Sequence, residues 1–128
     1  MREVLLVGLA GAIGTLSRFA VNGVALRTLG ERFPFATLIV NVVGSLLLGI
    51  VVIAIGVGSD MPRALRVAIT VGFFGAFTTY STFAIETVRF LEGGAWWSAA
   101  LNVSLNLVLG IAAVWLGLSL GRTFFDMG

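Results

Sequence analysis

The sequence predicts an all-α membrane protein built as a single domain over residues 1–128. Of the 128 residues, 59% are hydrophobic and only 11% are charged, so too little polar surface is available to cover the core of a soluble domain. Most charged residues stand in short clusters between long uncharged segments. Because a helix needs about 20 apolar residues to cross the hydrocarbon core, the chain has room for about four transmembrane helices and short turns.

The boundaries of the four spans follow from the positions of the charges. The segments 33–59, 67–85 and 93–121 contain no charged residue, and the first apolar segment is interrupted only by Arg18. The links TLGERFP, GSDMPR and EGG contain the Gly, Pro and charged residues that are typical of turns. We expect the spans at Val4–Leu26, Phe35–Val57, Arg66–Phe90 and Ala95–Leu120.

The N-terminal stretch MREVLLVGLAGAIGTL has two interpretations. Its apolar run with small residues is compatible with a cleaved signal peptide. However, Glu3 cancels the charge of Arg2, and the apolar pattern continues past Ala12 without interruption. We therefore expect a first span that is retained.

The arginines are almost evenly divided between the two sides of the predicted bundle. One side would hold Arg2, Arg63, Arg66 and Arg122, and the other Arg27, Arg32 and Arg89, with Arg18 in the same half of the first span. Because cytoplasmic loops normally carry the excess of Lys and Arg, this balance permits insertion in both orientations. An antiparallel, dual-topology homodimer would follow; the alternative is one orientation, fixed by a single decisive charge or by the order of insertion.

The composition excludes several classes of function. The chain has no cysteine and no histidine, which removes disulfides, thiolate nucleophiles, the usual zinc sites and imidazole acid–base chemistry. A formal charge of +2 gives no extended basic face for nucleic acid. No pair of carboxylates and no nucleophile with a base is evident, so an enzyme is not expected.

Polar side chains recur at helical spacing in the second and fourth spans. Thr37, Asn41 and Ser45 share one face of the second span, and Asn102 and Asn106 share one face of the fourth. Such stripes can simply form interhelical hydrogen bonds, which contribute about 0.6 kcal/mol each. Because asparagine stripes occur on two helices, a groove that accepts water or an ion is the alternative that we favour.

The third span contains the stretch GFFGAFTTYSTF, at residues 72–83. Gly72 and Gly75 weaken a helix, and the hydroxyls that follow offer the backbone competing hydrogen bonds. The sequence therefore predicts a broken third helix, whose freed carbonyls would attract a cation; the alternative is an unbroken helix with internally bonded hydroxyls. Tyr80 and Phe83 would lie on the same side of the resumed helix, where ring edges attract small anions.

Arg18 and Glu86 are the only ionisable residues well inside the predicted spans. Both are expected near a water-filled vestibule or at the headgroup level, because charge at the bilayer centre is costly. Arg18 would either gather anions at the mouth of a pore or anchor the first span. No feature of the sequence decides between these two roles.

Three stretches together resemble the Fluc/CrcB family of fluoride channels. These are GAIGTLSR in the first span, ATLIVNVVGSLLLG in the second and GFFGAFTTYSTFAIET in the third. The resemblance implies a dual-topology antiparallel homodimer in the bacterial plasma membrane, exporting fluoride passively through two pores that both subunits build. It also implies a structural sodium ion at the dimer centre, bound by the carbonyls of Gly75 and Thr78.

The same resemblance implies roles for residues along the ion pathway. Asn41 would be the pore asparagine, Tyr80 and Phe83 would stand beside the ions, and Arg18 would belong to the vestibule. The polar track would include Thr37, Ser81, Thr82 and Asn106. The chain departs from the family at Tyr80, where Phe is usual, and at Asn102 and Asn106, where Tyr and Ser are frequent.

Two other classes of function remain as alternatives. A small multidrug-type proton-coupled exporter is also a four-span antiparallel dimer, but it needs a carboxylate facing its cation site, normally in the first span. The first span here carries Arg18, and only Glu86 in the third span could serve. A structural subunit of a larger membrane complex would leave both asparagine stripes unexplained.

Overall fold

The computed structural model describes residues 1–56 and 59–125, and these form helices and turns without a strand. Four helical segments are long and apolar enough to cross a membrane: Arg2–Leu29, Phe35–Gly56, Arg63–Glu92 and Trp96–Phe125. This confirms the four predicted spans. Val57, the expected end of the second span, lies outside the described residues.

Three of the four observed helical segments, the first, third and fourth, extend past an end of the predicted span. The largest difference is at the fourth span, where α6 (Trp96–Phe125) continues past the expected end at Leu120. A helix need not stop where the hydrocarbon ends, and Arg122 in its last turn suits the partial negative charge of a helix C-terminus. The third span begins at Arg63 and ends at Glu92, so at each end the helix continues into a charged residue beyond the predicted bounds Arg66 and Phe90.

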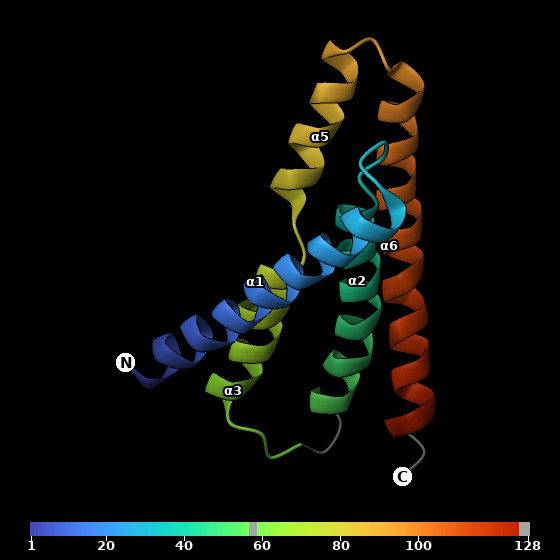
Figure 1. The fold of residues 1–128 in the computed structure, drawn as a ribbon. Coiled ribbons are helices and arrows are strands. Elements are labelled where there is room, and N and C mark those ends of the chain that lie inside the picture. The colour runs from blue at the N-terminus through green and yellow to red at the C-terminus, as the bar shows by residue number, and fades with distance from the viewer. Residues whose placement is uncertain (57–58, 126–128) are drawn as a thin grey trace.

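The second and fourth spans pack on each other over an extensive contact. Helix α2 (Phe35–Gly56) runs beside α6 along most of its length (Figure 1). Small residues permit this close approach: a Cβ added at Gly49 would lie 2.7 Å from the Val114 carbonyl oxygen, and one at Gly121 would lie 2.8 Å from the Ile53 Cβ. Van der Waals packing of this kind is what drives helix association in lipid.

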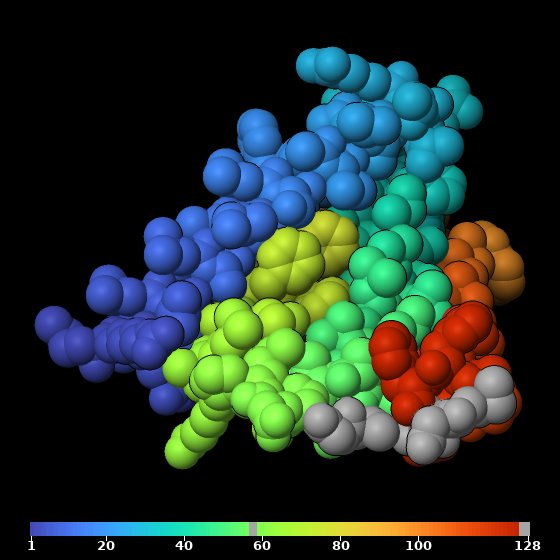
Figure 2. Space-filling model, turned by 90° about the horizontal axis from the view of Figure 1, so that it is seen from below, coloured from blue at the N-terminus to red at the C-terminus, as the bar shows by residue number. Residues whose placement is uncertain are grey.

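The first span packs on the third span. Helix α1 (Arg2–Leu29) crosses obliquely in front of the bundle and forms one flank of the molecule, opposite α6 (Figures 1 and 2). It contacts a π-helical segment, η1 (Ala68–Phe74), where a Cβ added at Gly72 would lie 2.7 Å from the Val7 carbonyl oxygen. Gly14 likewise packs on the Phe73 backbone, whereas a Cβ added at Gly8 would meet no atom within 4 Å.

The third span is interrupted, as predicted. The segments α3 (Arg63–Val67), η1 and α4 (Gly75–Phe77) follow one another, and then Thr78 and Thr79 adopt extended backbone with ψ angles of 162° and 114°. Helix α5 (Tyr80–Glu92) begins after them. The break therefore falls on two threonines and not on the glycines, since Gly72 lies in η1 and Gly75 in α4.

Much of the outer surface of the single chain is apolar. Large side chains such as Leu5, Leu9 and Phe19 of α1 are mostly exposed, as are Trp96 and Trp97 at the start of α6. Lipid or a second protein must cover such a surface, and tryptophans are frequent where a membrane meets water.

Candidate ion groove at the helix break

Asn41 of α2 holds Thr79, the second of the two extended residues, in place. Its Oδ1 accepts a hydrogen bond of 2.8 Å from the Thr79 N–H, and its Nδ2 donates to the Thr79 carbonyl at 3.2 Å. In an unbroken helix the Thr79 N–H would donate to the Gly75 carbonyl. One amide side chain therefore replaces backbone hydrogen bonds, which satisfies polar groups that could not be left bare inside a membrane.

The asparagines of α6 extend this network. Asn41 Nδ2 also donates to Asn106 Oδ1 at 3.0 Å, and Asn106 Nδ2 donates to Asn102 Oδ1 at 3.1 Å. Asn102 Nδ2 then donates to the Thr87 hydroxyl at 3.0 Å, and that hydroxyl donates to the Phe83 carbonyl at 2.8 Å. We call this set of side chains, Asn41, Asn106, Asn102 and Thr87, the amide relay.

A cavity of about 270 Å³ opens beside the break, and we call it the break groove. The rings of Tyr80 and Phe83 stand next to each other in it, with centroids 5.6 Å apart and planes inclined by 57°. Their predicted position on one side of the resumed helix is confirmed. The groove is lined by Asn41, Gly44, Ser45, Leu48, Thr78, Thr79, Tyr80, Phe83, Asn106, Leu107 and Gly110, none of which is charged.

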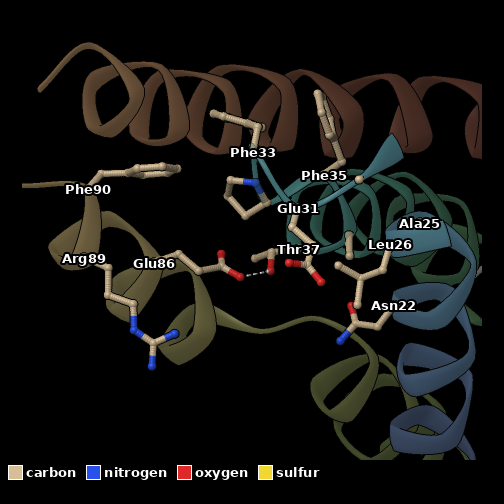
Figure 3. Close-up of a pocket in the computed structure, with 13 residues that line it drawn as sticks. Asn22, Ala25, Leu26, Glu31, Phe33, Phe35, Thr37, Glu86, Arg89 and Phe90 are labelled. Carbon is tan, nitrogen blue, oxygen red and sulfur yellow. Dashed lines mark hydrogen bonds between the residues drawn. The ribbon is translucent and has the colours of Figure 1, made fainter. Parts of the chain in front are cut away.

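A second cavity, of about 420 Å³, lies near the loop between α1 and α2, and we call it the charged vestibule (Figure 3). Glu31, Glu86 and Arg89 line it together with Asn22 and Thr37. The Thr37 hydroxyl donates to Glu86 Oε1 at 2.7 Å, while Glu86 Oε2 is buried and has no hydrogen-bond partner among the described residues.

The remaining predicted pathway residues lie outside the break groove. Thr82 is bonded to Thr79: the Thr79 hydroxyl donates to Thr82 Oγ1 at 2.9 Å, and the Thr82 N–H donates back to Thr79 Oγ1 at 3.3 Å. Ser81 is exposed at the start of α5, and Arg18 is half-buried on α1. Neither Ser81 nor Arg18 lines the break groove or the charged vestibule.

Some polar residues lie in positions that the helical spacing of the sequence did not predict. Asn102 was expected to share a groove with Asn106, but it is fully buried and lines neither cavity. Thr79 and Thr87 have structural roles that sequence reasoning did not assign to them. Ser45 does line the groove, in agreement with its place on the Asn41 face.

The fold and groove define a small four-span membrane protein whose interrupted third helix borders an uncharged polar cavity. Residues 5–118 match the family model described as CrcB-like protein, Camphor Resistance (CrcB). The chain belongs to this CrcB family.

Curated relatives cover nearly the whole chain. A protein of Shewanella woodyi is 42% identical over 117 residues, covering 91% of this chain and 94% of the relative. One of Nitratidesulfovibrio vulgaris is 43% identical over 122 residues, covering 95% and 98%. One of Syntrophotalea carbinolica is 42% identical over 120 residues, covering 94% and 98%. Each of the three is named fluoride-specific ion channel FluC.

Proposed function

We propose that this chain is a fluoride-selective channel that exports fluoride passively across a bacterial plasma membrane. The names of its bacterial relatives support this function, because each is called a fluoride-specific ion channel. An ion channel is not an enzyme, so the function requires no set of catalytic residues. The observation that carries the proposal is the break groove, where an amide, hydroxyls and two aromatic rings gather at a helix interruption without a charged side chain.

The chemistry of the break groove suits fluoride. A pore must replace the ion's hydration shell with enough donors to admit it and with weak enough donors to release it. Hydroxyls and amide N–H groups donate moderately, and the ring edges of Tyr80 and Phe83 carry partial positive charge. A lysine or arginine in the groove would bind the anion too strongly for conduction.

We further propose that two copies assemble as an antiparallel homodimer with two pores. The almost even distribution of arginines supports insertion in both orientations. The side chain of Tyr80 is 79% exposed although it lines the groove, so a single chain leaves one wall of the groove open. A second subunit would close that wall.

We also propose that the carbonyls of Gly75 and Thr78 bind one sodium ion at the dimer centre. The chain fits this ligand set: Thr79 donates its N–H to Asn41, so the Gly75 carbonyl loses its helical donor. Gly75 is exposed, and a Cβ added there would meet no atom within 4 Å, so its backbone is accessible to a partner. Carbonyls freed at interrupted helices are known ligands for sodium.

The direct test is fluoride efflux from liposomes that contain the purified protein, followed with a fluoride electrode beside a chloride electrode. We expect rapid fluoride release and little chloride release. Equal release of both ions would contradict the proposed selectivity, and release of neither would contradict the channel function.

A proton-coupled exporter is not supported. Its essential carboxylate would be Glu86, and Glu86 lies in the third span and is bonded to Thr37. Cation efflux driven by a proton gradient would be the observation in its favour.

A further inference from the structure

We infer that Asn102 and Thr87, which do not line the break groove, are positioning residues for the groove amide of Asn41 and for Phe83. They act through Asn106, which links Asn102 to Asn41. The inference rests on the proposed channel function for its flux measurement, but its spectroscopic measurement is independent of that function.

The hydrogen bonds that link one side chain of the amide relay to the next run in one direction. The Thr79 N–H donates to Asn41, and each side chain then donates to the next until the Thr87 hydroxyl reaches the Phe83 carbonyl. Each amide accepts at its oxygen and donates at its nitrogen, so each bond polarises the next one and strengthens it. The relay therefore behaves as one unit.

Both ends of the relay lie on the interrupted span. It starts at Thr79 in the break and ends at Phe83, whose ring lines the groove. Between these ends it passes through α2 and α6. The relay thus fixes the first turn of α5 against two other helices, and it connects the backbone of Phe83 to the amide of Asn41.

The relay also uses both N–H groups of Asn41. One donates to the Thr79 carbonyl and the other to Asn106 Oδ1, which leaves no free N–H for an ion. An anion that takes a hydrogen bond from Asn41 must displace either the Thr79 carbonyl, which belongs to the backbone of the break, or the side-chain oxygen Asn106 Oδ1. Asn106 Nδ2 donates to both the backbone carbonyl and Oδ1 of Asn102, at 3.0 and 3.1 Å. The second of these bonds depends on the Asn102 side chain, which therefore contributes to how firmly Asn106 is held.

Asn102 is well placed to control this exchange. Its side chain has 0% exposure, so its amide is bonded to protein and not to water. It accepts from Asn106 and donates to Thr87. Thr87 lies one turn beyond Phe83 on α5 and lines neither cavity described above. These side chains connect it to Asn41 through α6, and the first turns of α5 connect it to Thr79, which also bonds Asn41.

The test compares Thr87→Val, Thr87→Ser and Asn102→Leu. Thr87→Val keeps the shape and removes the hydroxyl, while Thr87→Ser keeps the hydroxyl and restores the relay. Thr123→Val is the matched control, because the Thr123 hydroxyl donates only within its own helix, to the Ser119 carbonyl. Two quantities are measured: fluoride efflux from liposomes, and the side-chain amide resonances of Asn41 and Asn106 in ¹⁵N–¹H spectra of the protein in nanodiscs.

We expect Thr87→Val and Asn102→Leu to shift both pairs of resonances and to change fluoride efflux by about tenfold, the rate equivalent of one hydrogen bond. Thr87→Ser and Thr123→Val should leave both quantities near the wild-type values. Unchanged Asn41 resonances in Thr87→Val would overturn the inference, as would shifted resonances with unchanged efflux. If Asn102→Leu does not fold, Thr87→Val alone decides. Wild-type protein without efflux but with relay-dependent resonances would contradict the channel function and not the relay.

Discussion

The break groove and the charged vestibule lie along the same chain but are built from opposite chemistry. The groove is lined by neutral dipoles, and the amide of Asn41 is fully hydrogen-bonded there. The vestibule holds two carboxylates and a guanidinium, and one oxygen of Glu86 has no partner among the described residues. The break groove therefore presents ordered neutral groups, and the charged vestibule gathers ionisable side chains near the loop between α1 and α2.

This difference indicates a division of roles. Charge at mid-membrane is costly, so if fluoride passes through the break groove, as we propose, halides are discriminated there by the number and geometry of neutral donors. Charges nearer the membrane surface can change the local ion concentration at a smaller cost. We therefore expect substitutions in the break groove to change the ratio of fluoride to chloride efflux. Substitutions in the charged vestibule should change the rate of fluoride efflux and leave that ratio unchanged.

The largest effect is expected from Asn41→Asp. The carboxylate would face the Thr79 carbonyl and Asn106 Oδ1, two acceptors that now receive hydrogen bonds, and it would place negative charge in the groove. Two lost buried hydrogen bonds of about 1–3 kcal/mol each correspond to a loss of fluoride efflux of at least about thirtyfold.

The matched control for this change is Asn22→Asp, since the charged vestibule already contains carboxylates. It should conduct fluoride at a measurable rate with normal selectivity. Normal efflux by Asn41→Asp in a bilayer recording would show that Asn41 is not in the pathway.

Removal of sodium is expected to weaken the dimer. If the carbonyls of Gly75 and Thr78 bind sodium, replacing it with a bulky organic cation at the same ionic strength leaves these oxygens facing one another. We expect a shift from dimer to monomer in detergent, measured by size-exclusion chromatography with light scattering. A dimer that is indifferent to sodium would argue against the carbonyl site and leave the groove intact.

A smaller effect is expected from Thr37→Val in the charged vestibule. The substitution removes the hydroxyl that donates to Glu86 Oε1, while Thr37→Ser retains it. Efflux should fall by about tenfold or less, because one hydrogen bond is lost, and the ratio of fluoride to chloride efflux should stay the same. A changed ratio would mean that the vestibule also selects, and the division of roles would be wrong.

The smallest effect is expected from Tyr80→Phe. The ring edge stays in the groove and only a mostly exposed hydroxyl is removed. We expect fluoride efflux within about threefold of the wild-type rate, less than the full equivalent of a buried hydrogen bond. A loss as large as that of Asn41→Asp would make the Tyr80 hydroxyl a principal donor.

The spans and the interruption could be predicted because their causes are local. Gaps between charges delimit the helices, and the hydroxyl run after Gly75 weakens one of them. The position of the break could not be predicted in the same way, because Asn41 bonds Thr79 across 38 residues of sequence. Gly72 shows the same limit: it was expected to weaken the helix, but it serves close packing against α1.

The asparagine stripes were only half informative. Helical spacing correctly placed Asn41 and Ser45 on one face, and it suggested that Asn102 and Asn106 act together. It could not show that Asn106 reaches the groove while Asn102 is enclosed between α5 and α6. Spacing defines a face of one helix, whereas burial depends on the neighbouring helices.

The extended pair Thr78 and Thr79 has a further electrostatic consequence. A helix end carries about half an elementary charge, positive at the N-terminus and negative at the C-terminus. Because the helix of the third span stops at Phe77 and starts again at Tyr80, it places a negative C-terminal end and a positive N-terminal end close together, with only Thr78 and Thr79 between them. One interruption can thus favour a cation on one side and an anion on the other without a single ionised side chain.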